Sequence, residues 1–448
     1  MTKESYFRSD MLSTLIDKII QLTPPALLAK AVKFIPAGVF EWKSQAQFRW
    51  IVRYAYKNSR FYRRRFDELG IDPSKVKKPS DLGSFFTTPL DIVDHAEDFL
   101  CKKPGIVFES SGTTGRNKRL YFGYDELDEI GRLSALGFFA WGLKPDSRVV
   151  NAFDFCIWIP GMVAHKGLEQ SKIFGMDAGK VDPIEVYKRI PIYKFDVIMG
   201  EPTWLIKLTE IAEKNGSYPL KYIITGAENM PQAARPWMEK VWGGAKVLMT
   251  YASVESGGAI GAEVCPECDG YHIDENGFLV EIADPDAEGY GEVVFTTLDR
   301  TVMPLIRYRN KDISKIINDR CSCGIQFRRL ARMRGRGDEM VVASGGNLYP
   351  LMFENILKDI DAITSDWQIV FSLRGIKEIM TFDLELREGQ SADAVKERVL
   401  NNIRDRYPDL WKNYSIAIFE IDFAFHPAGA LRSGKHKLLR VVDKRYAK

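Results

Sequence analysis

Apolar residues recur along the first 70 positions at the spacing of amphipathic helices. In residues 47–56, aromatic and aliphatic side chains return on one helical face, and a basic run at 63–65 follows on a charged face. Residues 11–41 are amphipathic and rich in Leu, Ile and Ala. The pattern predicts helices over residues 12–70 that pack as an N-terminal layer. A membrane-surface role for residues 11–41 is the less favoured alternative.

From about residue 105 to 310, short β-rich runs alternate with helical stretches. The runs expected to be strands are 105–108, 120–123, 147–151, 196–199, 222–225 and 246–250. Strands that alternate with helices predict a layered α/β architecture with a largely parallel sheet. The residue pattern changes at residues 277–309, where apolar and polar residues alternate in two runs, 277–282 and 291–296. These runs predict an antiparallel β subdomain.

Glycines and charged residues cluster at 334–338, which predicts a hinge or linker. Beyond it we expect strands at 339–342, 367–371 and 415–420, helices at 350–361 and 392–406, and a basic tail. The expected fold is therefore α/β with two domains. Residues 1–337 would form a large N-terminal domain of helices, mainly parallel sheets and a β subdomain, and residues 338–448 a small, mobile α+β lid domain.

Composition is that of a globular protein. Of the 448 residues, 45% are hydrophobic and 27% are charged, and the length predicts two or three domains. The formal net charge of +3 argues against an extended nucleic-acid surface. Apolar runs stay well below the roughly 20 residues that a spanning helix needs. Charged residues from Lys3 to Asp10 do not fit a signal peptide, so we expect a cytoplasmic protein without membrane insertion.

A run of small hydroxylated residues, two glycines and a lysine occupies residues 109–118, between two apolar segments. Glycines let backbone N–H groups approach an anion, and hydroxyls and Lys118 add further donors. The run predicts a phosphate-binding loop between two strands, and a solvated Ser/Gly hairpin is the alternative. No Gly-Lys-Ser/Thr ends the run, so a P-loop NTPase is disfavoured.

Four of the six cysteines form two close pairs, Cys265 with Cys268 and Cys321 with Cys323. In an intracellular protein such pairs favour metal binding, and four thiolates leave no open position on a tetrahedral Zn²⁺. The sequence predicts a structural zinc site, with four incidental thiols as the alternative. A zinc-ribbon nucleic-acid-binding module is disfavoured because acidic residues surround the pairs. Cys101 and Cys156 are expected to be packing residues.

An ordered set of motifs resembles the adenylate-forming (acyl-CoA synthetase-like) superfamily, in its phenylacetate–coenzyme A ligase-like branch. The motifs are residues 53–62, Ser-Ser-Gly-Thr-Thr-Gly at 110–115, Gly-Ala-Glu at 226–228, residues 251–255 and 304–309, Asp312, residues 335–340 and 345–350, and Arg-Ser-Gly-Lys at 432–435. The resemblance covers roughly residues 47–445. It implies that the chain converts a carboxylic acid, expected to be aromatic, and ATP into an acyl-adenylate and pyrophosphate, and then forms a thioester with coenzyme A.

The resemblance also assigns residues to the nucleotide. Phosphate contacts fall to Ser110, Ser111, Gly112, Thr113, Thr114, Gly115 and Lys118. Adenine and ribose contacts fall to Gly226, Ala227, Glu228, Tyr251, Ala252, Asp312 and Arg336. Glu255 would hold Mg²⁺, since a hard cation takes oxygen ligands. Without the resemblance, Glu255 would be interpreted as a helix cap and Asp312 as a turn residue.

Lys435 matches the lysine that the family uses in adenylation, and Lys437 is a rival because residues 440–445 align with the family tail in a register that favours it. A solvated basic tail is the alternative. Asp338 matches the hinge about which the C-terminal domain rotates between the two steps. The acid pocket is expected at Phe153, Phe155, His165 and Ser253, although Phe153 and Phe155 also suit a core strand. An amine or a carrier protein in place of coenzyme A, transfer of the nucleotide to a hydroxyl, and a homodimer all stay open.

Overall fold

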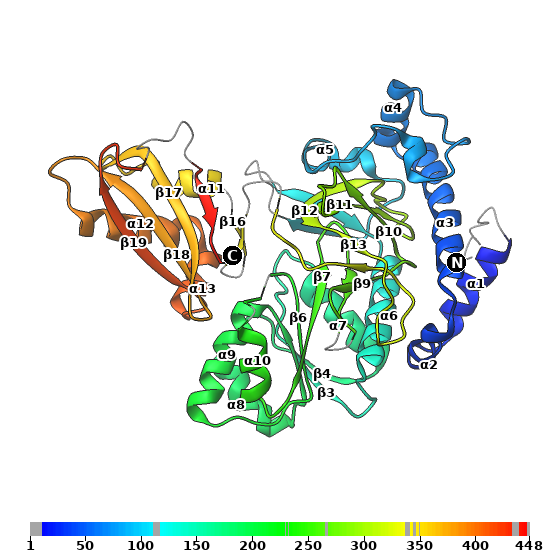
Figure 1. Ribbon diagram of the computed structural model, residues 1–448, viewed down its shortest axis with the longest axis horizontal. Coiled ribbons are helices and arrows are strands. Elements are labelled where there is room, and N and C mark those ends of the chain that lie inside the picture. Colours follow the sequence, from blue (N-terminus) through cyan, green and yellow to red (C-terminus); the bar gives the residue numbers. More distant parts are fainter. Residues whose placement is uncertain are drawn as a thin grey trace. The chain divides into compact units, whose positions relative to one another are not determined.

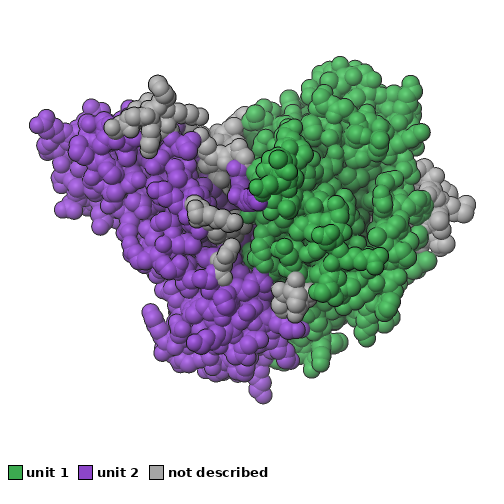
Figure 2. Space-filling view, in the orientation of Figure 1, with its two compact units in different colours: residues 1–112, 117–179, 248–333 green, residues 113–116, 180–247, 334–448 purple. Residues whose placement is uncertain are grey.

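The computed structural model describes residues 11–110, 117–228, 230–231, 233–264, 268–336, 341–343, 346–348, 350–431 and 439–445. Their contacts divide the chain into two compact units, which Figure 2 colours separately. Unit 1 comprises residues 1–112, 117–179 and 248–333, and unit 2 comprises residues 113–116, 180–247 and 334–448. Both units combine helices with sheets (Figure 1), which confirms the α/β class. The domain boundary at 337/338 stays a prediction.

Unit 1 opens with the predicted helical layer. Its elements are α1 (Met11–Leu22), α2 (Pro25–Ala31), the 3₁₀ turn η1 (Val32–Phe34), α3 (Ala37–Asn58) and α4 (Arg60–Leu69). Ser59 separates α3 from α4, because its hydroxyl accepts a hydrogen bond from the Tyr62 backbone N at 3.3 Å and caps α4. Gly70 ends α4 in the left-handed conformation. None of the helices in the described part of the chain is long and apolar enough to cross a membrane.

The next part of unit 1 alternates helices and strands. It contains η2 (Pro79–Leu82), α5 (Pro89–His95), η3 (Ala96–Phe99), β1 (Ile106–Ser110), β2 (Lys118–Phe122), α6 (Tyr124–Trp141), β3 (Arg148–Asn151), α7 (Pro160–Ser171) and β4 (Phe174–Asp177). β1 and β2 form an antiparallel hairpin, and β3 and β4 run parallel with Asn151 opposite Asp177. Helix α6 packs against both α2 and α7. The predicted strands at 105–108, 120–123 and 147–151 are confirmed.

Two antiparallel sheet regions complete unit 1. The first contains β7 (Lys246–Ala252), β8 (Ala259–Ala262), β9 (Tyr271–Ile273), β14 (Arg329–Leu330) and β13 (Ile316–Ile317) in that spatial order. The second is the predicted β subdomain, a three-stranded sheet of β10 (Phe278–Ala283), β11 (Gly291–Thr297) and β12 (Tyr308–Ser314). Gly270 lets β9 approach β14, because a Cβ there would lie 2.2 Å from the Leu330 carbonyl oxygen.

Unit 2 contains a helix–strand alternation. Its elements are α8 (Pro183–Tyr193), β5 (Val197–Gly200), α9 (Pro202–Asn215), β6 (Tyr222–Thr225) and α10 (Ala234–Val241). Proline at the first position begins α8 and α9, where its missing N–H costs no hydrogen bond. β5 and β6 are parallel and buried, as expected for strands covered on both faces.

The C-terminal part of unit 2 is an α+β arrangement. Its elements are β15 (Val341–Ala343), β16 (Gly346–Leu348), α11 (Pro350–Leu357), β17 (Ile363–Arg374), β18 (Lys377–Leu386), α12 (Ala392–Arg406), α13 (Pro408–Ser415), β19 (Glu420–Pro427) and β20 (Val441–Asp443). Four of the strands form a sheet in the order β19-β18-β17-β20. Phe353 of α11 contacts Phe371 of β17 and Phe382 of β18, which packs α11 on this sheet.

Two sequence predictions in this region are corrected. The strand expected at 415–420 is wrong, because α13 continues to Ser415 and β19 begins only at Glu420. The chain between them closes the helix end, where the backbone N–H of Ile418 donates to the Asn413 carbonyl at 2.9 Å. Within the expected basic tail, Val441–Asp443 forms β20, which pairs in parallel with β17.

Candidate active site

Lys118 is the first residue of β2 and the last residue of the predicted phosphate loop. The hairpin ladder places it opposite Ser110, and both side chains are buried. The ladder therefore fixes the backbone from which the lysine projects. The remaining predicted phosphate contacts, Ser111, Gly112, Thr113, Thr114 and Gly115, lie outside the described residues.

Glu255 follows β7 and is only 3% exposed. Its Oε1 accepts hydrogen bonds from Lys118 Nζ and from Tyr308 Oη, the second at 2.9 Å. Burial by itself would raise the pKa of Glu255, but the Lys118 ammonium, helped by the Tyr308 hydroxyl, holds it below the ordinary value. The carboxylate is thus ionised at neutral pH. Both contacts fall on Oε1, and no other side chain of the described residues donates to Oε2.

Arg300 supports the backbone at this position. It is buried, donates to the carbonyl oxygens of Glu255 and Tyr121, and lies with its guanidinium 4.0 Å from the centre of the Phe122 ring. Burial lowers its pKa from the ordinary value, and the nearby carboxylates oppose that change. Arg300 was not selected from the sequence, because a lone arginine after a strand carries no distinguishing pattern.

A second cluster joins Tyr251, Asn310 and Asp312. The Tyr251 hydroxyl and the Asn310 amide each donate to Asp312 Oδ2 at 2.7 Å, and Asn310 also donates to the Tyr251 hydroxyl at 2.7 Å. Tyr251 lies on β7 and the other two on β12. The structure brings together two residues that the sequence assigned to the nucleotide, and adds Asn310, which the sequence reasoning missed.

Ala252 and Ser253 follow Tyr251. Ala252 is exposed, whereas Ser253 is half-buried and engaged in a turn, where its Oγ accepts from the Ser256 backbone N at 3.1 Å. Ser256 in turn donates to the Gly258 carbonyl at 2.7 Å. Ser253 thus shapes the chain that leads to Glu255, and its predicted contact with the acid stays a prediction.

The Gly226, Ala227 and Glu228 segment lies in unit 2, directly after β6. Ala227 has φ 70°, a left-handed conformation that is uncommon outside glycine. Glu228 is buried and its Oε2 accepts from the Thr203 hydroxyl at 2.8 Å and the Thr203 backbone N at 3.2 Å. These contacts fix the segment at the start of α9.

The residues predicted for the acid pocket differ in their exposure to solvent. Phe153 is buried after β3, as a core residue would be, whereas Phe155 is exposed and His165 is half-buried. His165 Nδ1 lies 2.6 Å from Asp177 Oδ2, and Asn151 donates to the other oxygen of Asp177 at 2.9 Å. Asn151 and Asp177 end the parallel strands β3 and β4, the side of an α/β sheet where ligands commonly bind.

The predicted C-terminal residues are described only in part. Arg336 is half-buried in unit 2. Asp338, Lys435 and Lys437 lie outside the described residues. Of the other cysteines, Cys101 is half-buried, and burial, with a smaller contribution from Glu126, raises its pKa to about 12, as suits a packing thiol. Cys156 is exposed, so the packing role expected for it is wrong.

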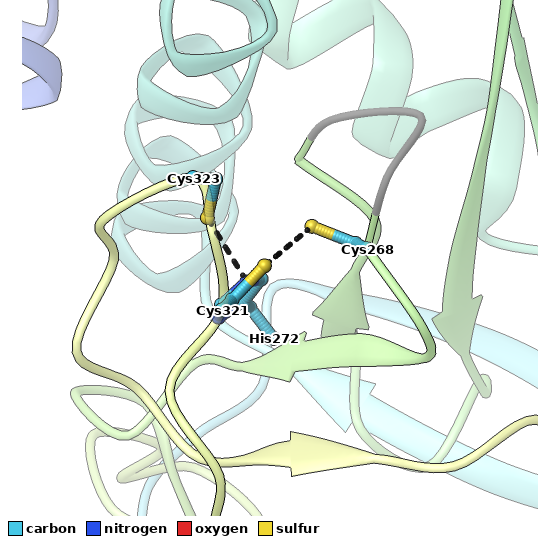
Figure 3. A group of neighbouring side chains, drawn as sticks. All are labelled: Cys268, His272, Cys321 and Cys323. Atoms are coloured by element: carbon cyan, nitrogen blue, oxygen red, sulfur yellow. Dashed lines mark hydrogen bonds between the residues drawn. The ribbon is translucent and has the colours of Figure 1, made fainter.

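Three of the predicted zinc ligands meet in unit 1. Cys268, Cys321 and Cys323 form a cluster with His272, in which one ligand atom from each residue lies within 4.8 Å of the others (Figure 3). Cys268 Sγ is 3.3 Å from Cys321 Sγ, and Cys323 Sγ is 3.3 Å from His272 Nε2. His272 Nδ1 lies 3.3 Å from the Phe327 carbonyl oxygen, a contact that would leave Nε2 for a metal.

His272 was not predicted as a ligand. It sits on β9, four residues after Cys268 and about 50 before the other pair, so its spacing matches no metal motif. Cys265, the fourth predicted ligand, lies outside the described residues. Three thiols and an imidazole form a donor set that suits a closed, tetrahedral Zn²⁺ site.

The sequence was compared with known proteins. No protein-family model matches. The chain is 30% identical over 423 residues to the phenylacetate-coenzyme A ligase of Thermus thermophilus, a match that covers 88% of this chain and 94% of the relative. It is 26% identical over 419 residues to the enzyme of the same name from Escherichia coli, covering 89% and 93% of the two chains.

Solved structures share the fold. A 2-hydroxyisobutyryl-CoA ligase in complex with an acyl-adenylate and CoA superposes with a TM-score of 0.76 at 21% identity, over 93% of this chain and 92% of the other. The same enzyme in the postadenylation state gives a TM-score of 0.65 over the same shares. The extent of the match to the Thermus enzyme shows that this chain is a member of the phenylacetate–coenzyme A ligase family of adenylate-forming enzymes.

Proposed function

We propose that the chain is an ATP-dependent acid–coenzyme A ligase. In the first step a carboxylate oxygen of the acid bonds to the α-phosphorus of ATP, and the bond from that phosphorus to pyrophosphate breaks. In the second step the sulfur of coenzyme A bonds to the acyl carbon, AMP leaves, and the thiol proton passes to solvent. Both reactants of the first step are anions, so positioning and charge neutralisation supply most of the catalysis.

The observation that carries this proposal is the buried Lys118–Glu255–Tyr308 cluster, in which Lys118 comes from the predicted phosphate loop and the other two residues from two of the family motifs. Lys118 provides a positive charge beside the phosphate loop. Glu255 is ionised and has Oε2 free of side-chain donors among the described residues, which fits the ligand that a hard cation requires. Bound Mg²⁺ would neutralise phosphate charge there. Tyr308 and Arg300 hold Glu255 in place.

The nucleoside is assigned to the Tyr251–Asn310–Asp312 cluster and to the segment after β6. Asp312 would accept the ribose hydroxyls, and Tyr251 and Asn310 fix its carboxylate. Gly226, Ala227 and Glu228 would line the adenine, because the left-handed Ala227 and the Thr203–Glu228 bonds give that segment one shape. Arg336 and Ala252 complete the proposed contacts.

An aromatic acid is the proposed substrate, since the matched relatives are named phenylacetate-coenzyme A ligase. Exposed Phe155 and the His165–Asp177 pair are the described residues that support a pocket after β3. Lys435, with Lys437 as the rival, is the proposed adenylation lysine, and Asp338 the proposed hinge. A cytoplasmic location and a homodimer stay predictions from the sequence.

A structural Zn²⁺ is the second part of the proposal. We assign its ligands to Cys268, His272, Cys321 and Cys323, with Cys265 as the alternative fourth ligand. The site would tie the chain before β9 to the segment between β13 and β14. Three thiols and an imidazole gathered in this way would be unfavourable neighbours if all were deprotonated without a cation.

Acid-dependent ATP–pyrophosphate exchange with the purified protein tests the function. A panel of aryl and alkyl acids should give the fastest exchange with an aryl acid, and addition of coenzyme A should give the thioester. Exchange without thioester would move the acceptor to an amine or a carrier protein, and absence of exchange with every acid would overturn the proposal. Glu255→Gln should abolish exchange. Glu281→Gln, a change at a partly buried carboxylate on β10 that pairs with Arg307, is the matched control.

A further inference from the structure

The two most exposed large apolar side chains of the described residues lie close together in the sequence. Phe34 is 86% exposed and Leu22 is 83% exposed, and Leu27 and Ile19 are each more than half exposed. Large apolar side chains gathered on one part of a surface mark a site of interaction. The family motifs begin only at residue 53, so this segment lies outside the residues assigned to the proposed function.

The exposed residues of α2 and η1 lie on one side of a helical segment whose other side is packed. Leu27, Lys30 and Phe34 follow one another at intervals of three and four residues, so their side chains share a face. Ala29 and Val32, on the opposite face, are buried, and α2 packs on α6. The packed side explains why the segment folds as a helical layer, but it does not explain the apolar side chains turned to solvent.

Helix α1 continues the exposed surface. Leu22 follows Lys18 by four residues and Ile19 by three, which places these side chains on one side of α1. The chain between α1 and α2 is attached to α6, because Arg132 donates to the Thr23 carbonyl oxygen at 3.3 Å. Both helices lie at the margin of unit 1 (Figure 1). We call the exposed set the outer face; its residues are Lys18, Ile19, Leu22, Leu27, Lys30, Lys33 and Phe34.

The charged residues of the outer face all have the same sign. Lys18, Lys30 and Lys33 are exposed, and no Asp or Glu stands between Lys18 and Glu41 in the sequence. Lysines beside exposed apolar side chains are typical of helices that lie in a membrane surface, where the apolar groups enter the acyl boundary and the lysines reach lipid phosphates. A second copy of the chain fits less well, because a two-fold contact would place these lysines against the same lysines.

We propose that the outer face docks the protein on an anionic lipid surface. Leu22, Leu27 and Phe34 enter the interface, and the three lysines contact the lipid phosphates. Helix α1 has 12 residues and is about 18 Å long, so it lies along the surface and does not cross a hydrocarbon core of about 30 Å. The proposal is independent of the proposed function, since no residue of the outer face is assigned to ATP, the acid or coenzyme A.

Co-sedimentation of the full-length protein with lipid vesicles tests the proposal. Vesicles that contain phosphatidylglycerol and phosphatidylcholine should bind the protein roughly tenfold more tightly than phosphatidylcholine alone, and added sodium chloride should weaken the binding. A triple variant with Leu22→Ser, Leu27→Ser and Phe34→Ser should lower the affinity roughly tenfold or more, because it removes the apolar groups that enter the interface.

A second triple variant tests the charge, and two further variants are controls. Replacing the three lysines of the outer face by glutamine should abolish the preference for the anionic vesicles. The controls change exposed residues elsewhere and should bind as the parent does. Their substitutions are Leu69→Ser, Leu90→Ser and Ile192→Ser for the apolar residues, and Lys75→Gln, Lys77→Gln and Lys78→Gln for the lysines. All four variants should keep the parent's midpoint of urea unfolding, since every changed side chain is exposed.

Three results would overturn the proposal. The first is absence of binding to both kinds of vesicle, or equal binding by the parent and the apolar triple variant. The second is an unchanged preference for anionic vesicles in the lysine triple variant, because charge is what assigns the lipid. The third is a dimer in light scattering that the apolar triple variant converts to a monomer, without vesicle binding by either; this result would assign the outer face to a second copy of the chain.

Discussion

The Tyr308 hydroxyl donates to Oε1 of Glu255 at 2.9 Å, the oxygen that Lys118 also contacts. Against burial, this carboxylate is held ionised chiefly by the Lys118 ammonium and, to a smaller extent, by the Tyr308 hydroxyl. The phenol of Tyr308 is therefore part of the proposed metal-binding group, although it touches no reactant.

Tyr308→Phe should weaken both stability and adenylation. The change keeps the ring beside Phe295 and removes one hydrogen bond to a charged group, worth about 1.5–3 kcal/mol. We expect a lower midpoint in urea unfolding and exchange slowed several-fold. Glu255 has a lowered pKa, so its stabilising contribution is present above the unfolded value near 4.5 and is lost as pH falls. In the variant, the loss of the free energy of unfolding at acid pH should therefore begin at a higher pH. Tyr187→Phe, at the surface of unit 2, is the control, and an unchanged onset of this loss in Tyr308→Phe would contradict the prediction.

Asn310→Ala should act on nucleotide affinity. Asn310 holds both members of the Tyr251–Asp312 pair at 2.7 Å, and its loss leaves the carboxylate less well fixed. Of the two hydrogen bonds that the change removes, the one to Asp312 bears on the carboxylate that would bind the ribose, and its loss, about 1.5 kcal/mol, corresponds to roughly a tenfold higher KM for ATP, with kcat little changed. Steady-state kinetics with varied ATP measure it. Asn215→Ala, at the exposed end of α9, is the control and should leave KM for ATP unchanged. A fall in kcat without a change in KM in Asn310→Ala would contradict a role of Asn310 in nucleotide affinity.

Metal analysis of freshly purified protein should find about one zinc per chain. His272→Ala should lower the zinc content and the melting temperature, since loss of a ligand from a closed site removes metal-linked stability. Cys265→Ser decides between the two candidate fourth ligands: full zinc content in this variant assigns His272, and loss assigns Cys265. The exposed Cys156→Ser is the control. If a chelator leaves the protein free of zinc and its melting temperature does not change, the proposed structural role of the metal is wrong.

Asp299 should make the protein less stable as pH rises. Burial, and then neighbouring carboxylates, raise its pKa from 3.8 to about 7. The charged groups near Asp299 are Lys43, Glu126, Glu129, Asp274 and Arg300. Because the folded-state pKa is raised, the stability that neutral Asp299 provides is complete below about pH 4 and is lost as pH rises to about 7.

Asp299→Asn should remove this loss. The variant should match the parent near pH 4 and exceed its free energy of unfolding at pH 8 by roughly 4 kcal/mol at most, the value of three pKa units. Urea unfolding across pH 4–8 measures the difference. The exposed Asp319→Asn should follow the parent curve. Parallel curves for Asp299→Asn and the parent would show that this carboxyl ionises normally.

Much of the fold was predictable because it rests on local pattern. Runs such as Tyr222–Thr225 are short, β-branched and bounded by breakers, and they are strands as expected. The strand expected at 415–420 failed because the apolar residues Ile416 and Ile418 suit a helix end as well as a strand. Pro408 at the first turn of α13, a helix-start signal, was the evidence that could have corrected it.

The site was predictable where motifs carried it and not where packing did. Lys118 is predicted by the phosphate-loop pattern, Glu255 and Asp312 by the family motifs, and the structure supplies their partners. Asn310 and His272 were missed because a single amide or imidazole on a strand has no sequence signature. Only the pairing of β9 with β14 brings His272 near the second cysteine pair.

Ser110 and Lys118 form the last residue pair of the β1–β2 hairpin. The position of the lysine and the composition of the connection that follows Ser110 can therefore be varied separately. The lysine belongs to the sheet, and the residues between the two strands do not have to supply its position. Insertions or exchanges confined to that connection should therefore retune how tightly phosphate is held without relocating the cation. If the proposed function holds, the hairpin offers a place where nucleotide affinity can be varied in a library while Lys118 keeps its position.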